Sequence, residues 1–211
     1  MKNSVKLKST GLTILCVLLA TVTFGNTPDK TDSLTIPKDK FKIDYRHSAG
    51  SSLLLLGNIG DSVRYIQLNY GYRLTQKDNF IAEAITWTYY EPLGTYMHSK
   101  EYYPGKVKAY GIGLGYQRFL WKNLFITVEP TFFLQQFSDT EDKKLQKGFQ
   151  LYLQFIVGYR FEFLNKRLFI EPAYALKYWP VNTNFPETFS AIEHGAPKYK
   201  FEPSLNFGFR F

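Results

Sequence analysis

Lys200-Phe201-Glu202-Pro203-Ser204-Leu205-Asn206-Phe207-Gly208-Phe209-Arg210-Phe211 is the stretch of sequence that decides the fold. Each odd position from Phe201 to Phe211 holds an aromatic or apolar residue, and the even positions hold mostly polar or small residues. Successive side chains of a β-strand point to opposite faces, so this alternation predicts a strand with one apolar face. A strand that continues to the last residue is unusual for a soluble domain, whose ends tend to fray.

The other end of the chain predicts a secretory signal peptide over residues 1–25. An apolar run at 11–24 follows three positive charges and is too short for a spanning helix, which takes about 20 residues. The small residues around its end predict cleavage before Asn26, and Ala20 offers a second site. The three charges are Lys2, Lys6 and Lys8.

After the signal, a polar segment at 26–40 predicts a flexible periplasmic lead-in, and residues 41–211 predict one β-domain. The only cysteine, Cys16, lies inside the signal peptide. The mature chain would therefore contain no thiol for disulfides or for thiolate catalysis.

Composition favours a membrane barrel. The chain contains 16 Tyr and 19 Phe, yet its mean hydropathy is only −0.25, as happens when apolar and polar positions alternate. Removing the three lysines of the signal from 26 Lys+Arg leaves 23 against 18 Asp+Glu, a net charge of +5. No basic run is longer than Lys143-Lys144, which argues against nucleic acid and favours anionic lipid or lipopolysaccharide as a partner.

Eight segments with a period of two predict an all-β, eight-stranded antiparallel up-and-down transmembrane β-barrel. Connections after the second, fourth and sixth segments are short, and those at 92–105, 138–146 and 180–197 are long. Short periplasmic turns and longer outer loops are typical of outer-membrane barrels. The predicted segments are 41–56, 62–75, 79–91, 106–120, 123–137, 147–164, 166–179 and 198–211.

The segment at 147–164 indicates which face points outward. Its odd positions from Phe149 to Phe163 are large and apolar, whereas its even positions include glutamines and Arg160. An eight-stranded barrel is too narrow to hold eight large side chains from each strand, so we expect the apolar face to point outward, to lipid. The inward face carries small residues as well, among them Gly111, Gly113 and Gly115.

The inward face predicts a lumen charge network. A buried cluster of both signs is stable only when its charges are paired and hydrogen-bonded, so we interpret it as a salt-bridge plug. A proton or ion path, or a catalytic carboxylate, is the alternative. Several of its carboxylates precede prolines, and each Glu-Pro dipeptide predicts a bulge or a local bend because proline cannot donate to a sheet. The predicted network comprises Arg46, Arg73, Glu129, Arg160, Glu171, Lys177, Glu202 and Arg210.

Aromatic residues near segment ends predict girdles at the two membrane interfaces. These residues are Trp87, Tyr89, Tyr90, Trp121, Tyr178 and Trp179. Stacking on carbohydrate by tyrosines of the outer loops is the alternative for Tyr96, Tyr102 and Tyr103.

The sequence contains no motif for catalysis, metal binding or a cofactor. His47 and Ser48 are adjacent on a predicted strand and so point to opposite faces. A lipid-modifying enzyme would have to combine a loop histidine with a loop acid. The candidates are His98, His194, Glu101 and Glu193.

Over 41–211, the terminal Phe207-Gly208-Phe209-Arg210-Phe211 and the stretch 168–180 resemble the small eight-stranded outer-membrane barrels of the OmpA/OmpX/OmpW kind, in particular a poorly characterised subgroup. The resemblance implies an outer-membrane location, and it implies that Phe207, Phe209 and Phe211 form the signal that the barrel-assembly machinery reads. The resemblance identifies no ligand-binding or catalytic residue in this chain, and it does not imply the cell-wall anchoring of the full-length OmpA type.

The sequence therefore predicts a monomeric, exported, integral outer-membrane barrel with a largely plugged polar lumen. Its expected role is a scaffold that presents the loops at 92–105, 138–146 and 180–197 to an extracellular ligand. Outer-membrane lipid, lipopolysaccharide and the barrel-assembly machinery are its expected partners. A narrow pore or small-solute conduit is the first alternative, and a lipid-modifying enzyme is the second.

Overall fold

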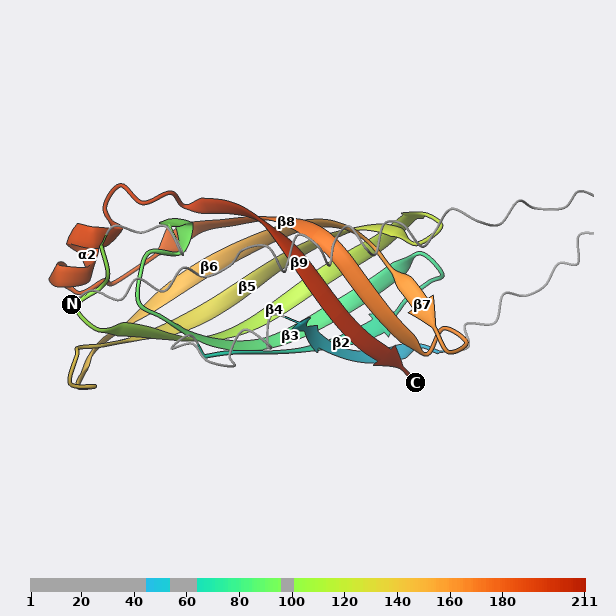
Figure 1. Cartoon of the computed structure of the whole chain (residues 1–211), viewed down its shortest axis with the longest axis horizontal. Helices are drawn as coiled ribbons and strands as arrows, with labels where there is room; N and C mark the ends of the chain where they lie inside the picture. Colours follow the sequence, from blue (N-terminus) through green and yellow to red (C-terminus); the bar gives the residue numbers. More distant parts are fainter. Residues whose placement is uncertain (1–44, 54–63, 96–100) are drawn as a thin grey trace, which may run out of the picture. The chain divides into compact units, whose positions relative to one another are not determined.

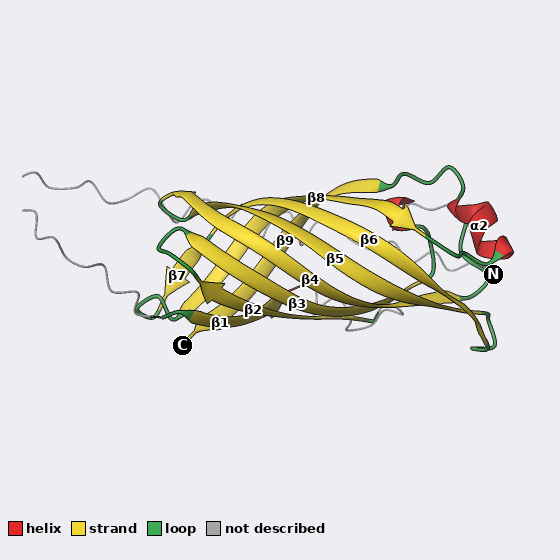
Figure 2. Ribbon diagram, turned by 180° about the vertical axis from the view of Figure 1, so that it is seen from behind, coloured by secondary structure: helices red, strands yellow, loops and turns green. Residues whose placement is uncertain are grey.

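The computed structural model describes residues 45–53, 64–95 and 101–211. They form a closed antiparallel β-barrel whose strands run obliquely around its axis (Figure 1, Figure 2). Neighbouring strands in the chain pair with each other, and the last strand pairs with the first. The predicted all-β, eight-stranded antiparallel up-and-down barrel is confirmed.

Nine strand segments make the eight strands of the barrel, because the ladder is interrupted at Arg160 between β6 and β7. Both segments pair with β8 and so occupy one position in the barrel. From β2 onward, the predicted segments agree with the observed strands to within a few residues. The strands are β1 (His47–Ser52), β2 (Tyr65–Arg73), β3 (Asp78–Tyr89), β4 (Lys106–Trp121), β5 (Leu124–Ser138), β6 (Lys144–Tyr159), β7 (Phe161–Phe163), β8 (Leu168–Asn182) and β9 (Tyr199–Arg210).

The two ends of the barrel differ (Figure 1). The tight β2–β3, β4–β5 and β7–β8 turns lie with the C-terminus at one end, which we call the turn end. The other end, the loop end, carries α2 (Glu187–Glu193) in the β8–β9 connection and the 3-10 helix η2 (Leu93–Thr95) after β3. No helix among the described residues is long and apolar enough to cross a membrane.

The predicted long loop at 138–146 is wrong. Ser138 pairs with Lys144, so that β5 and β6 extend beyond their predicted ends and leave only 139–143 to connect them. The prediction failed because the polar composition of this stretch conceals a ladder that continues past the apolar part of both strands.

The bulge predicted at Glu129-Pro130, Glu171-Pro172 and Glu202-Pro203 is also wrong. Pro130, Pro172 and Pro203 each stay in register with a partner on the neighbouring strand. The register shift on β8 lies instead around Trp179-Pro180, opposite Tyr152 of β6. A proline can thus forfeit one ladder hydrogen bond without shifting the strand, provided that its neighbours hold the register.

Apolar and polar side chains separate to the outside and the inside of the barrel. Along residues 107–120 of β4, buried and exposed side chains alternate without a break, and the exposed Ile112 has 66% of its surface accessible. The predicted outward apolar face is confirmed. Inside, a Cβ atom on Gly111 would approach the ring of Phe133 to 2.4 Å, so no side chain fits there.

Candidate functional site

The lumen is the candidate site, because it gathers the buried charged and amide side chains of the barrel. The alternation along each strand sends every second residue inward, so one polar face per strand converges on the axis. Three layers follow one another from the turn end to the loop end: a cluster of ion pairs, a group of carboxylates beside a cavity, and an aromatic plug.

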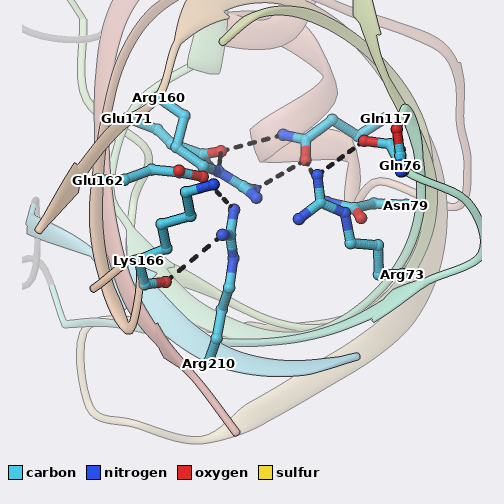
Figure 3. Close-up of polar contacts among 9 residues, drawn as sticks. All are labelled: Arg73, Gln76, Asn79, Gln117, Arg160, Glu162, Lys166, Glu171 and Arg210. Carbon is cyan, nitrogen blue, oxygen red and sulfur yellow. Dashed lines mark hydrogen bonds and ion pairs between the residues drawn. The ribbon is translucent and has the colours of Figure 1, made fainter. Parts of the chain in front are cut away.

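At the turn end, Arg160 and Glu171 form the centre of a hydrogen-bonded cluster (Figure 3). Arg160 Nε donates to Glu171 Oε1 at 2.6 Å, and both side chains are less than one-tenth exposed. Gln117 bridges the layer, since its Nε2 donates to Glu171 at 3.2 Å and its Oε1 accepts from Arg160 and from Asn79 at 2.9 Å each. Each charge therefore has a partner, as a buried ion pair requires.

A second ion pair widens this layer toward the C-terminus. Arg210 Nη2 donates to Glu162 Oε1 at 2.6 Å, and Arg73 Nη2 donates to the backbone carbonyl of Gln76 at 2.7 Å. Aromatic rings pack against the cations: the Arg160 guanidinium lies 4.4 Å from the ring centroid of Phe169 and 4.7 Å from that of Phe119. The guanidinium group of Arg160 is therefore held between aromatic rings and a carboxylate.

The middle layer holds charged side chains from four strands. Lys177 of β8 and Lys200 of β9 both pair with Glu202 of β9. Glu83 and Glu129 lie side by side next to Gly113, and Thr131 Oγ1 donates to Glu83 Oε1 at 3.3 Å. Glu83 also accepts from Gln67 Nε2 at 2.6 Å. These groups face a cavity of about 80 Å³ whose wall is both polar and apolar, and which has room for several waters.

Aromatic side chains close the loop end. Trp87 stacks on Phe133 with ring centroids 5.4 Å apart, and Trp179 stacks on Tyr152 at 5.7 Å. Above them, Phe189 of α2 is fully buried. Its ring stacks on Tyr103 at 4.9 Å and meets Phe137 edge-on at 5.5 Å. We call the rings of Phe137, Tyr103, Phe185 and Phe189 the mouth plug.

A hydrogen bond fastens α2 to the barrel mouth. Tyr103 Oη donates to Glu193 Oε2 at 2.5 Å, and Asn182 Nδ2 lies 3.4 Å from Glu193 Oε1. Burial raises the pKa of the Glu193 carboxyl above its ordinary value, although both hydrogen bonds oppose the shift. Burial and the neighbouring Glu193 also raise the pKa of Tyr103. Both groups therefore favour their neutral forms in the docked arrangement.

The structure brings most of the predicted lumen charges together, in two separate layers. Arg160, Glu171, Arg210 and Arg73 lie in the turn-end cluster, while Lys177, Glu202 and Glu129 lie in the middle layer. Arg46 is a correction: its backbone carbonyl accepts from Arg73 N at 2.8 Å, but its side chain is exposed because it lies at the edge of the barrel, just before β1.

A second correction concerns three of the six predicted interface aromatics, which lie inside the barrel. Trp87, Tyr89 and Trp179 belong to the interior aromatic cluster, where Tyr89 and Trp179 are almost fully buried. Trp87 and Tyr89 lie an even number of residues from Glu83, and Trp179 lies two residues from Lys177, so their side chains point inward like those of the two charged residues. This alternation, and not their position near strand ends, decides where they lie. Tyr90 is half-buried, whereas Trp121 and Tyr178 are exposed on the outer surface.

The remaining predicted residues lie on the surface or outside the described part. Phe207, Phe209 and Phe211 are 40–55% exposed along the outer side of the closing strand. The ring of His47 stacks on Phe211, and its Nδ1 lies 2.7 Å from Tyr70 Oη. His98 and Tyr96 lie outside the described residues.

The carboxylate of Glu193, the acid next to His194 in the sequence, is directed to residues other than this histidine. Glu193 directs its carboxylate to Tyr103 and Asn182, and Glu101 is exposed. Within residues 45–53, 64–95 and 101–211, no three His, Cys, Asp or Glu side chains are arranged to hold a metal ion.

Three functional residues were missed at the level of the sequence. Glu83 and Gln117 have inward parity on segments whose faces could have been read, so alternation was a sufficient signal for both. Phe189 had no such signal, because its burial depends on where α2 meets the barrel mouth.

No protein-family model, curated protein or solved structure matches this chain, so the functional argument rests on the residues described above.

Proposed function

We propose that this protein is an exported, integral outer-membrane β-barrel that serves as a plugged scaffold for its loop-end surface. In this proposal residues 1–25 are removed as a signal peptide, and 26–40 remain in the periplasm. The turn end faces the periplasm and the loop end faces outward. The likeness to OmpA/OmpX/OmpW-type barrels belongs to the same proposal, as does recognition of Phe207, Phe209 and Phe211 by the barrel-assembly machinery.

One observation carries the membrane part of the proposal: the polarity of the barrel is inverted. Large apolar side chains cover its outside, with Leu68, Ile112 and Leu134 each at least 60% exposed. Buried inside are Glu83, Arg160 and other charged or amide groups. Water would make such an outer surface a site of aggregation, whereas lipid hydrocarbon is a suitable solvent for it.

The two closed layers support the scaffold part of the proposal. Ion pairs fill the turn end, and the mouth plug fills the loop end, so the central cavity lies between two obstructions. The surface left to meet an outside partner includes the 139–143 hairpin tip and Tyr102, which is 66% exposed. A continuous pore would need both layers to rearrange.

The first experiment compares gel mobility of the refolded protein with and without boiling, followed by conductance in a planar bilayer. We expect a heat-dependent mobility shift and a silent bilayer. Solubility without detergent and no shift would overturn the membrane proposal. Discrete conductance steps would replace the scaffold with the narrow pore.

A pair of variants tests the membrane proposal at the level of single residues. Leu114→Arg places a charge in the middle of the outward face of β4, and we expect it to reduce stability in lipid vesicles by about 2–4 kcal/mol. Leu145→Arg is the matched control, because Leu145 is similarly exposed but lies near the loop end of β6. In a soluble barrel, both substitutions would leave the free energy of unfolding nearly unchanged.

A further inference from the structure

Cations gather on one side of the outer surface at the loop end. They lie on or next to β2, β4 and β6, and all project outward from the barrel wall or its rim. We call this group the basic patch: Arg64, Lys106, Lys108, Lys144 and Lys147.

The strand register places this patch directly beside the apolar belt. Thr88, Lys108, Gln136 and Lys147 are consecutive partners across β3–β6 and form one row. Two residues nearer the middle of the barrel, the next outward row is largely apolar. This row consists of Ile66, Thr86, Tyr110, Leu134 and Phe149. The surface therefore changes from apolar to cationic within about 7 Å, which is two residues along a strand.

The charge of the patch is largely uncompensated. Lys106 forms an ion pair with Asp142, while the other four cations make no ion pair within the described part of the chain. Lys108 Nζ lies 5.3 Å from the ring centroid of Tyr110, which keeps the ammonium group close to the apolar row. Four cations without carboxylate partners attract a multiply charged anion.

Two surface grooves run through the patch on either side of Lys106, Lys108 and Tyr110. The first, about 560 Å³, continues between cations onto Leu134. The second, about 610 Å³, continues from Arg64 onto Ile66. Each groove thus has a cationic upper part and an apolar lower part, the arrangement that a lipid with a charged headgroup would fit.

Among the described residues, the outer face of the opposite side ends differently at the loop end. Tyr178 of β8 and Tyr199 of β9 pair with each other near the loop end, and they are 41% and 56% exposed. Near the loop end, the outer face of β8 and β9 therefore carries aromatic rings, whereas the outer face of β4 and β6 carries cations.

We propose that the basic patch is a binding site for the phosphate groups of an anionic lipid in the outer leaflet. The phosphates lie between Arg64, Lys108 and Lys147, and the acyl chains lie along the row that contains Ile66 and Leu134. The proposal rests on the proposed membrane location. It adds a defined lipid site to one face of the barrel.

The test measures binding of lipid A, a phosphorylated glycolipid, to the detergent-folded protein by native mass spectrometry. Lys108→Gln with Lys147→Gln removes two cations of the patch, and we expect about 25-fold weaker binding, from about fivefold for each cation near a lipid surface. The matched control, Lys77→Gln with Lys122→Gln, removes the same charge from exposed turn-end lysines and should change binding less than about twofold. Phosphatidylcholine binding should be the same for both variants.

Equal loss in both double variants would overturn the proposal, since the effect would then follow net charge alone. Displacement of lipid A by millimolar inorganic phosphate would also overturn it, because the site would then take the free ion. Both exposed double variants should retain the heat-dependent mobility shift. A wild-type protein without that shift contradicts the proposed membrane barrel itself, whereas a shift without preferential lipid A binding contradicts only the lipid site.

Discussion

The turn end of the lumen is filled by ion pairs between residues of the barrel wall, whereas the loop end is filled by aromatic rings that come partly from connecting segments. Glu171 lies on β8, and Arg160 lies between β6 and β7, which both pair with β8, so the barrel wall itself holds both residues. Phe189 and Tyr103 lie in connections and reach the mouth only because those connections fold over it.

This difference predicts two kinds of stability in one molecule. A side chain on a barrel strand cannot leave its layer unless the ladder opens, so the turn-end cluster should be lost only with the whole barrel. The mouth plug can detach with α2 while every strand remains paired, which makes it a separate local unit. The predictions below test this distinction.

The largest effect is expected at the turn end. Glu171→Ala leaves Arg160 buried without its carboxylate, and we expect a loss of about 3–5 kcal/mol in the free energy of unfolding. The urea midpoint of the protein in lipid vesicles measures it. Glu141→Ala is the matched control, because Glu141 is exposed at the hairpin tip. An unchanged midpoint for Glu171→Ala would show that the cluster does not stabilise the barrel.

At the loop end, Phe189→Ala should weaken docking of α2 by about 3 kcal/mol, the usual effect of truncating a buried phenylalanine. The readout is hydrogen exchange of the Ser190 and His194 amides, which donate within α2. Exchange in β4 and β5 should not change. Phe189→Leu keeps most of the apolar volume and should cost less than about 1.5 kcal/mol. Global destabilisation by Phe189→Ala would show that plug and barrel form one cooperative unit.

The smallest effect concerns pH. Docking raises the pKa of Glu193 above its ordinary value of 4.5, so the docked state binds a proton more tightly than the undocked state. The contribution of Glu193 is fully present below pH 4.5 and is lost as the pH rises through the raised value. We expect exchange at Ser190, corrected for its intrinsic rate, to quicken over this range. Glu193→Gln should abolish the dependence; its persistence in that variant would assign it to another group.

The sequence was a good guide wherever alternation alone carried the information. It placed Glu171, Lys177 and Arg210 on the inward face, and the structure brings each of them into an ion pair. It could also have placed Trp87 and Trp179 inside, because both share that parity. Their position near strand ends suggested the membrane interface instead, and this weaker argument was the wrong one to follow.

The sequence could not say which cation meets which carboxylate. Arg160 could have met Glu129 or Glu202 as well as Glu171, since all three carboxylates point inward. The choice depends on the stagger between strands, which is fixed only when β9 pairs with β1 and the sheet closes. For the same reason, the row of cations beside Tyr110 becomes visible only once the register is known.

By itself, the sequence determined the class of fold, the number of strands and the face to which each strand residue points. These features follow from local backbone geometry, because a pleated strand alternates its side chains wherever it lies. The tertiary structure alone decided the three layers of the lumen, the burial of Phe189 and the one-sided basic patch. Each of these depends on contacts between residues far apart in the chain, and closure of the barrel sets their heights relative to one another.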